Sequence, residues 1–290
     1  MARRGDDPAL RELAAVVALL RNGSHPSNHY ADLIESAGGA ESILEQEHGL
    51  LAPELIDGAG RDVEHWVKQG IRPLSVLDPD YPANLRAVHD RPALIFLAGS
   101  LIPTDERAVA VIGSRRASPS GLELAHAITT ELTAAGYTIV SGLAAGIDTV
   151  AHTTALSNGA RTIAVLGNGL TRCYPPQNAG LQRRIASEGA LVSQFWPETA
   201  PSRETFPMRN AVMSGMALAT VIVEAGRTSG ARTQARWALA HGRPVLLAHG
   251  LLRQGWAREL AGRPGTHVIG TPREVPAVVE RIASTQPPLG

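Results

Sequence analysis

Hydrophobic residues recur at helical spacing in the first quarter of the chain. Leu13, Val16 and Leu20 follow one another at intervals of three or four residues, and glycines separate this period from the next ones. The pattern predicts a small bundle of short helices over residues 8–69. Over residues 73–99 it changes to short apolar runs around a turn, which predicts short strands leading into a second domain.

Beyond residue 107, apolar runs of about five residues alternate with glycine-bearing turns and helical periods. The six runs cover residues 108–112, 138–140, 162–166, 190–192, 220–223 and 244–248. Continuous apolar strands that alternate with helices indicate a parallel sheet covered on both faces. We therefore expect a doubly wound, Rossmann-like α/β domain with a mostly parallel sheet over residues 71–290, preceded by a small all-α domain over residues 1–70.

Polar residues and glycines mark the ends of the expected helices. Ser118 and Pro119, with Ser120 and Glu123 as a capping pair, are expected to open the first helix of the α/β domain, and Gly136 is expected to close it. Glycines at the ends of the later helical periods have the same role.

Charge is divided unevenly along the chain, although the formal net charge is zero. Residues 1–100 carry 15 Asp and Glu against 9 Lys and Arg, whereas residues 101–290 carry 12 against 18. A polyanion would therefore bind the second part. Lys68 is the only lysine, which excludes a Walker A loop from the α/β domain because that loop needs a lysine on its phosphates.

Several classes of protein are disfavoured by the remaining composition. Cys173 is the only cysteine, so an internal disulfide and a thiolate metal cluster are excluded. No stretch is apolar enough to span a membrane, and Gly5, Asp6 and Asp7 stand where a signal peptide would be apolar. The ten histidines are scattered, with no pair at ligand spacing beside a carboxylate. We expect a cytoplasmic protein with no metal site, no cofactor and no membrane contact.

The residues that follow the expected strands are rich in glycine. They read G-S-R-R from residue 113, S-G-L-A-A-G-I-D from 141, G-N-G from 167 and E-A-G-R-T-S-G from 224. In an open parallel sheet, ligands bind beyond the carboxyl ends of the strands. Glycine lets the backbone approach a phosphate, and the start of a helix supplies free N–H groups. Four such turns in register predict a phosphate-binding edge, and the missing G-x-G-x-x-G after the first strand argues against a site for NAD.

The segment from Phe206 to Asn210 lies just before the helix that leads to the fifth strand of the α/β domain. Arg209 and Asn210 could contact a phosphate or a base edge, and Phe206 could offer a stacking face. A helix cap with a core aromatic residue explains the same pattern. The candidate phosphate- and nucleic-acid-binding residues are Gly113, Ser114, Arg115, Arg116, Ser141, Gly142, Gly146, Asn168, Phe206, Arg209, Asn210, Arg227, Ser229, Gly230 and Thr233.

The order of these motifs resembles the DprA (Smf) family of DNA-processing proteins. The matching stretches are G-S-R from residue 113, S-G-L-A-x-G-I-D-x-x-A-H-x-x-A-L from 141, Y-P from 174, F-P-x-R-N from 206 and V-E-A-x-x-x-S-G from 223, with Thr233 beyond them and D-Y-P-x-x-L from residue 80 at the entry. About two hundred residues are covered.

The resemblance implies a SAM-like helical domain, an extended Rossmann-like domain, and binding of single-stranded DNA without strong sequence preference. It also implies a homodimer that hands the strand to RecA during natural transformation. In that case Arg115 would hold a phosphate, the Gly142 to Gly146 turn and Ser229-Gly230 would line the groove, and Arg209 with Asn210 would complete it.

The chain departs from the family pattern at several positions. Ala211 stands where another arginine usually follows Arg-Asn, and Gln194 replaces an acidic residue. The loop over residues 249–253 lacks the family's glycine and asparagine pattern, and the N-terminal part lacks the Gly-x-Gly hairpin. No winged-helix domain is expected.

Two other functions use the same superfold. A LOG-type nucleotide phosphoribohydrolase needs an acidic residue shortly after a Gly-x-Gly-Thr turn, and residues 229–236 carry no carboxylate. Glu224 and Asp148 remain as carboxylates at strand ends, but such residues also cap helices. A sensor of a small nucleotide would need the same phosphate cradle and stays open. We expect a binding protein and not an enzyme.

Overall fold

A nine-stranded sheet runs through the part of the chain that the computed structural model describes, residues 7–226 and 229–285. The strand order is β1-β2-β6-β5-β4-β3-β7-β8-β9. The strands are β1 (Arg72–Ser75), β2 (Leu94–Gly99), β3 (Ala108–Ile112), β4 (Thr138–Ser141), β5 (Thr162–Val165), β6 (Ala190–Ser193), β7 (Ala219–Ile222), β8 (Val245–Ala248) and β9 (Thr266–Ile269). Strands β3 to β9 are parallel to one another, and β2 is antiparallel to both β1 and β6.

Twelve α-helices accompany these strands within the described residues. They are α1 (Pro8–Asn22), α2 (Ser27–Ala37), α3 (Glu41–His48), α4 (Ala52–Lys68), α5 (Ala83–Arg86), α6 (Pro119–Ala134), α7 (Ile147–Ser157), α8 (Ala179–Glu188), α9 (Thr205–Met216), α10 (Ala231–Ala240), α11 (Gly255–Ala261) and α12 (Glu274–Thr285). None of the helices over the described residues is long and apolar enough to cross a lipid bilayer. The doubly wound, mostly parallel α/β fold predicted from the apolar runs is confirmed.

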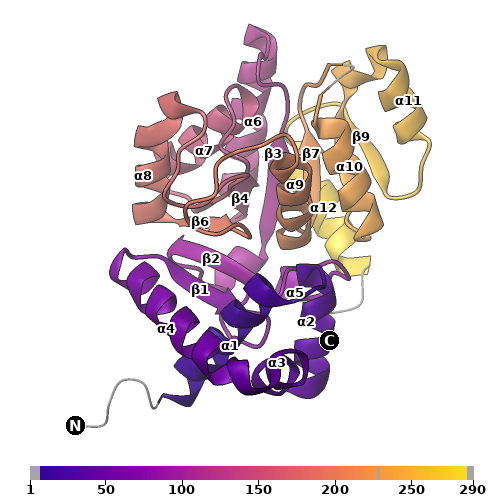
Figure 1. The fold of residues 1–290 in the computed structure, drawn as a ribbon. Helices are drawn as coiled ribbons and strands as arrows, with labels where there is room; N and C mark the ends of the chain where they lie inside the picture. Colours follow the sequence, from indigo (N-terminus) through magenta and orange to yellow (C-terminus); the bar gives the residue numbers. More distant parts are fainter. Residues whose placement is uncertain (1–6, 227–228, 286–290) are drawn as a thin grey trace.

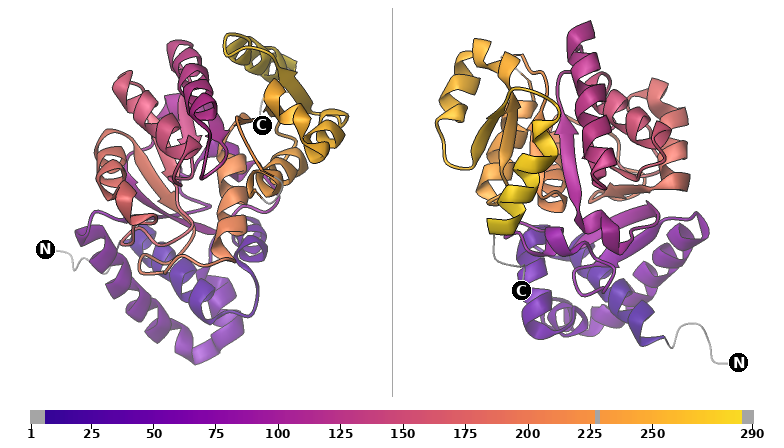
Figure 2. Two further views of the ribbon diagram at one scale, coloured as in Figure 1. Left: turned by 90° about the horizontal axis from the view of Figure 1, so that it is seen from above. Right: turned by 180° about the vertical axis from the view of Figure 1, so that it is seen from behind.

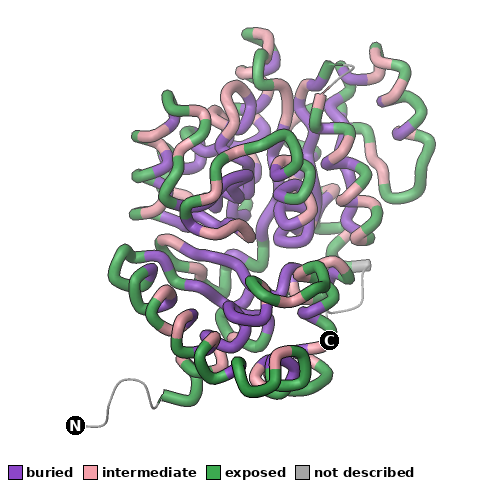
Figure 3. Tube along the Cα trace, viewed as in Figure 1, coloured by how far each residue is buried: buried purple, intermediate pink, exposed green. Residues whose placement is uncertain are grey.

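Helices cover both faces of the sheet because successive residues of each strand point to opposite sides. On β3, Val109 and Val111 pack in the cluster that contains Ile128 of α6, whereas Ala110 packs in the cluster that contains Met213 of α9. Figure 1 views the face that α9 and α10 cover, and the view from behind in Figure 2 shows α6 and α12 on the other face. The central strands lie in the buried interior (Figure 3).

The N-terminal helices α1 to α4 gather at one end of the molecule, next to β1 and β2 (Figures 1 and 2). Trp66 of α4 lies edge-on to Phe96 of β2, 5.1 Å between ring centroids, and stacks on Trp196 at 5.9 Å. The guanidinium of Arg21 lies 5.0 Å from the Trp196 ring. One continuous hydrophobic cluster therefore joins the helical bundle to the sheet.

Two local expectations need correction. Helix α6 is capped by Ser118, whose hydroxyl accepts from Gly121 N, with Pro119 at the first helical position, so Ser120 and Glu123 do not form the N-terminal cap. Strand β9 was not predicted from the sequence, because only Ile269 among its four residues is buried and the strand therefore has no apolar run.

His152 of α7 is a fully buried polar residue between helix and sheet. Its Nδ1 lies 2.7 Å from Thr162 Oγ1, whose own hydroxyl donates to the Ile139 carbonyl. Nδ1 therefore carries the hydrogen, and Nε2 is buried without a partner among the described residues. Burial, assisted by the positive charge of Arg209, lowers the pKa of His152 to about 3.

This burial predicts a pH dependence of stability. Below the ordinary histidine pKa of about 6.5, His152 is protonated in the unfolded chain but stays neutral in the folded chain. Because the unfolded chain binds this extra proton, lowering the pH favours unfolding. Between pH 7.5 and 5.5 the free energy of unfolding should fall by about 1.4 kcal/mol on account of this residue. Urea titrations of the parent and of His152→Asn at several pH values give the free energy of unfolding as a function of pH. The parent should show the steeper fall toward acid pH. The slope should persist in a matched variant of the exposed His249, and equal slopes in all three proteins would contradict the assignment.

Candidate nucleic-acid interface

The chain reverses its direction of winding between the adjacent strands β3 and β7. From β3 the sheet grows through β4 to β6 on one side, and from β7 through β8 to β9 on the other. The carboxyl ends at such a switch point form a crevice that serves as the ligand site of open α/β sheets. A pocket of about 100 Å³ lies there, and its lining includes Arg115, Asp148, Phe206, Arg209, Asn210 and Gln234. We call it the switch-point pocket.

Arg209 forms the inner wall of the switch-point pocket. Its side chain is buried, and its Nη1 donates to the carbonyl oxygens of Gly142 and Val165, both at 2.7 Å. Its Nε donates to Asn210 Oδ1 at 3.1 Å. The guanidinium thus ties the ends of β4 and β5 to α9. Burial lowers the pKa of Arg209 to about 10 against the attraction of the Asp148 carboxylate, so the group remains a cation at neutral pH.

Asp148 lines the same pocket from the first turn of α7. Its Oδ2 accepts hydrogen bonds from the backbone N–H groups of Gly142 and Ala144, at 3.1 and 3.3 Å. Burial raises the pKa of Asp148, while the positive charge of Arg209 and these hydrogen bonds lower it. The carboxylate therefore shapes the turn after β4.

A basic and aromatic group lies at the mouth of the pocket. The exposed Arg115 places its guanidinium 4.8 Å from the centroid of the Phe206 ring, and the Arg209 guanidinium lies 6.0 Å from the same centroid. Tyr174, which is 42 % exposed, lies 5.7 Å from Phe206. We call Arg115, Tyr174 and Phe206 the aromatic–basic cluster. It presents one exposed positive charge and two aromatic rings beside the pocket. Sequence reasoning had selected Tyr174 only as part of a motif.

The glycines of the rim differ from their expected role. A Cβ on Gly142 would overlap the Arg209 guanidinium, one on Gly146 would overlap the Ser114 carbonyl, and one on Gly167 would come within 2.7 Å of the Phe206 ring. These three glycines let protein groups approach each other and do not open the backbone to a ligand. Gly226 and Gly230 are exposed with nothing near the Cβ position, so the open backbone of the rim follows β7.

The other predicted site residues fall into separate groups. Ser141 and Asn168 are buried, and their polar atoms bond to the carbonyls of Val111, Gly169 and Arg172, so they belong to the scaffold and not to the accessible surface. The remaining residues lie as follows: Gly113, Ser229 and Gly230 line the pocket; Ser114, Arg116 and Thr233 are partly or fully exposed outside its lining; and Arg227 lies outside the described residues.

The segment from Phe206 to Asn210 forms the first turns of α9 and does not precede that helix. Thr205, the first residue of α9, donates from its hydroxyl to the Gly167 carbonyl, which anchors the helix start beside the turn after β5. Arg209 and Asn210 therefore point inward, whereas Phe206 reaches the mouth of the pocket.

Glu224 has a structural task at the end of β7. Its carboxylate accepts from the Ser118 backbone N–H at 3.0 Å and from the Ser118 hydroxyl. The negative charge thereby stabilises the N-terminus of α6. Both carboxylates at the strand ends, Glu224 and Asp148, are thus engaged with backbone N–H groups.

Sequence reasoning missed Gln234, which is one helical turn into α10. Its side chain is 1 % exposed, lines the switch-point pocket, and has neither Nε2 nor Oε1 bonded to any described residue. A buried unpaired amide costs about 1–3 kcal/mol, and such groups are usually satisfied by a ligand or water. Only the packing of α10 against the pocket reveals this residue, because a glutamine in a helix carries no signal of its own.

Comparison with known proteins places the fold in one family. Residues 72–261 match the family described as DNA recombination-mediator protein A, which is more than half of the chain. The DNA processing protein DprA of Bacillus subtilis is 33 % identical over 191 residues, 66 % of this chain and 64 % of that protein. Protein Smf of Escherichia coli K12 is 39 % identical over 218 residues, 72 % of this chain and 58 % of that protein. The chain thus spans less than two thirds of the length of these relatives.

Two solved structures share the fold. The X-ray structure of DprA from Streptococcus pneumoniae superposes with a TM-score of 0.75 at 29 % identity, over 91 % of this chain and 97 % of that chain. DprA from Helicobacter pylori, whose structure concerns the single-stranded DNA binding mode of that protein, superposes with a TM-score of 0.65 at 24 % identity, over 73 % and 96 %. The chain belongs to the DprA/Smf family of DNA-processing proteins, the DNA recombination-mediator protein A family.

Proposed function

We propose that this protein binds single-stranded DNA along the carboxyl rim of its sheet, without strong sequence preference. The observation that carries the proposal is the switch-point pocket, where the buried cation of Arg209 and the unpaired amide of Gln234 lie beneath the exposed guanidinium of Arg115. A phosphate is an anion rich in acceptors and fits this set of donors.

The aromatic–basic cluster supports a nucleic-acid strand as the ligand. Arg115 has no carboxylate partner among the described residues, so its charge is free to meet a phosphate. Phe206 and Tyr174 offer ring faces on which bases of any identity can stack, at about 1–3 kcal/mol per base. Stacking and phosphate contacts carry little sequence information, which agrees with binding of low specificity.

The size of the switch-point pocket favours a polymer over a free nucleotide. Its volume of about 100 Å³ is well below the roughly 300–1,000 Å³ of pockets that enclose a small-molecule ligand. It can take one phosphate group and leaves the rest of a nucleotide on the open rim. A small-nucleotide sensor stays the alternative, and competition by mononucleotides separates the two functions.

We propose a binding role and not catalysis. Glu224 and Asp148 accept hydrogen bonds from backbone N–H groups, which occupies the carboxylates nearest the rim. The start of α10 over residues 229–236 carries no acid, so hydrolysis of the LOG type lacks its general acid. The single-stranded DNA binding mode described for the H. pylori relative supports the same function here. On the basis of family resemblance, we also propose that the protein acts in the cytoplasm and delivers the strand to RecA during natural transformation.

Replacement of Arg115 by alanine tests the phosphate contact. We expect binding to oligonucleotides of any sequence to weaken by about tenfold, and the slope of log K against log salt to decrease by about one, because one counterion-releasing contact is lost. Fluorescence anisotropy at several salt concentrations measures both quantities. Arg263→Ala removes the same charge at the amino end of β9 and should leave both unchanged. Parental affinity and slope in Arg115→Ala would place the groove elsewhere.

Replacement of Gln234 by methionine separates binding from stability. Because its buried amide has no partner in the described part of the chain, an apolar side chain of similar size should leave the free energy of unfolding unchanged or raise it by about 1 kcal/mol. The same change should weaken oligonucleotide binding by about tenfold, since a donor to the ligand is lost. Urea denaturation and anisotropy give the two values. Loss of stability together with unchanged binding would assign Gln234 to the core.

We also propose that the protein forms a homodimer through its α/β domain, on the basis of family resemblance. Multi-angle light scattering of the full chain should give twice the mass of one chain at micromolar concentrations. A single-chain mass at high concentration would remove the dimer from the proposal and leave strand binding untouched.

A further inference from the structure

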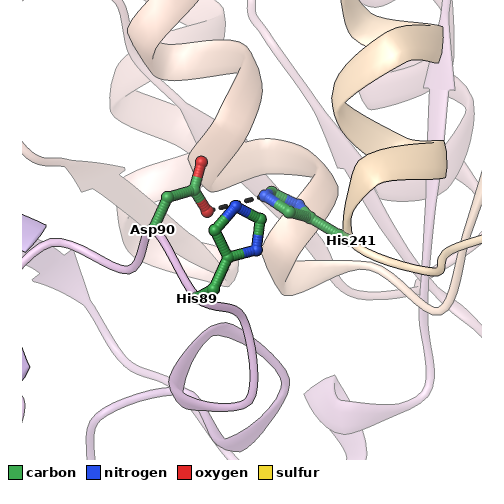
Figure 4. Close-up of side chains that lie close together, drawn as sticks. All are labelled: His89, Asp90 and His241. Atoms are coloured by element: carbon green, nitrogen blue, oxygen red, sulfur yellow. Dashed lines mark hydrogen bonds and ion pairs between the residues drawn. The ribbon is translucent and has the colours of Figure 1, made fainter.

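Two histidines and an aspartate meet on the side of the molecule where α10 ends. His89 and Asp90 lie in the segment between α5 and β2, and His241 caps the C-terminus of α10 (Figure 4). One ligating atom from each side chain lies within 4.8 Å of the others. Ligand spacing in the sequence does not reveal this cluster, because 151 residues separate Asp90 from His241 along the chain.

His241 is oriented by Ser214 of α9, on the side of the imidazole ring away from Asp90. Its side chain is fully buried, and its Nδ1 lies 3.1 Å from Ser214 Oγ. Ser214 has one hydroxyl hydrogen, and its oxygen lies 3.1 and 3.0 Å from the carbonyl oxygens of Asn210 and Ala211. When that hydrogen goes to a carbonyl, Ser214 Oγ accepts from Nδ1–H, and the lone pair of Nε2 faces Asp90.

The lone pair of His241 Nε2 then points at the Asp90 carboxylate, 2.7 Å away. At this separation the two atoms share a proton in the metal-free protein, and a metal ion would replace that proton once the two ligand atoms have moved apart. Histidines that bind metals typically donate their other ring N–H to an oxygen acceptor, and His241 does so toward Ser214 in the tautomer that carries its hydrogen on Nδ1.

A catalytic triad of Ser214, His241 and Asp90 does not explain the arrangement. Ser214 is fully buried within α9, and its hydroxyl is engaged by the carbonyls of its own helix. A nucleophile needs access to its substrate. The accessible side of the cluster is formed instead by His89, which is exposed, and by Asp90, whose side chain is 16 % exposed.

We propose that His89, Asp90 and His241 bind a divalent transition-metal ion of the zinc type. Two imidazoles and one carboxylate are typical ligands of Zn²⁺, at about 2.0–2.2 Å, with water in the fourth position. The exposed ring of His89 turns toward the ion, and Asp90 and His241 separate slightly to admit it.

The ion would clamp the segment before β2 to the end of α10. Gly230 at the other end of this ten-residue helix lines the switch-point pocket, about 15 Å away at 1.5 Å per residue. The metal therefore stabilises the packing of the C-terminus of α10 against the segment before β2, and it takes no part in strand binding. This inference does not depend on the proposed function.

A zinc titration of the metal-free full chain tests the site. The rings of His25 and His29 lie 4.4 Å apart and could hold zinc weakly, so all proteins carry His25→Ala and His29→Ala. With a chromophoric chelator as competitor, this background protein should bind one Zn²⁺ per chain.

Single variants in this background test the ligands. His89→Ala, which removes an exposed side chain, should weaken the affinity for Zn²⁺ by about tenfold or more, and His249→Ala should not change it. Ser214→Ala should weaken it by about tenfold through His241.

Thermal melts supply the second readout. Zinc at about 100 times its dissociation constant should raise the Tm by about 5 °C in the background protein and in His249→Ala, and by none in His89→Ala or Asp90→Asn. Oligonucleotide binding by metal-free His89→Ala should equal that of the background. Absence of a stoichiometric zinc ion, or binding that survives both His89→Ala and Asp90→Asn, would overturn the proposal.

Discussion

The buried guanidinium of Arg209 is the interaction on which the rim of this protein depends. A buried cation is costly unless its hydrogen bonds and its charge are compensated. Here two strand-end carbonyls and Asn210 accept from it, and the Asp148 carboxylate opposes its charge. The requirement extends to Gly142, because any side chain there would occupy the space of the guanidinium. The turn after β4, the end of β5 and the start of α9 are thereby fixed relative to one another.

This scaffold separates the groups that shape the rim from the groups that remain free for a ligand. Asp148, Glu224, Ser141 and Asn168 are all committed to backbone partners. Above them, Arg115 and Tyr174 are exposed and Phe206 is partly exposed. A strand bound here would meet preorganised donors and would not need to order them, which lowers the entropic cost of association.

The candidate metal site at the opposite end of α10 also combines a buried, oriented residue with an exposed one. His241 is buried and oriented by Ser214, while His89 remains exposed. The same helix therefore begins at the switch-point pocket and ends at a second cluster of polar side chains. The contacts among the rings of Trp66, Phe96 and Trp196 join the helical bundle to the edge of the sheet. The two parts therefore share one hydrophobic core.

The amino-acid sequence by itself determined the strands β3 to β8, the order of helices between them and the glycine-rich turns, since burial on both faces leaves a local record in each apolar run. It also selected Arg115, Phe206 and Arg209 as candidate site residues. Only the tertiary structure decided which of these residues line the switch-point pocket, that Ser141 and Asn168 are internal, that Gln234 lines the same pocket, and that Asp90 meets His241. The physical reason is that apolar periodicity reports whether a residue is buried, whereas its partners are set by the packing of segments that lie far apart in the chain.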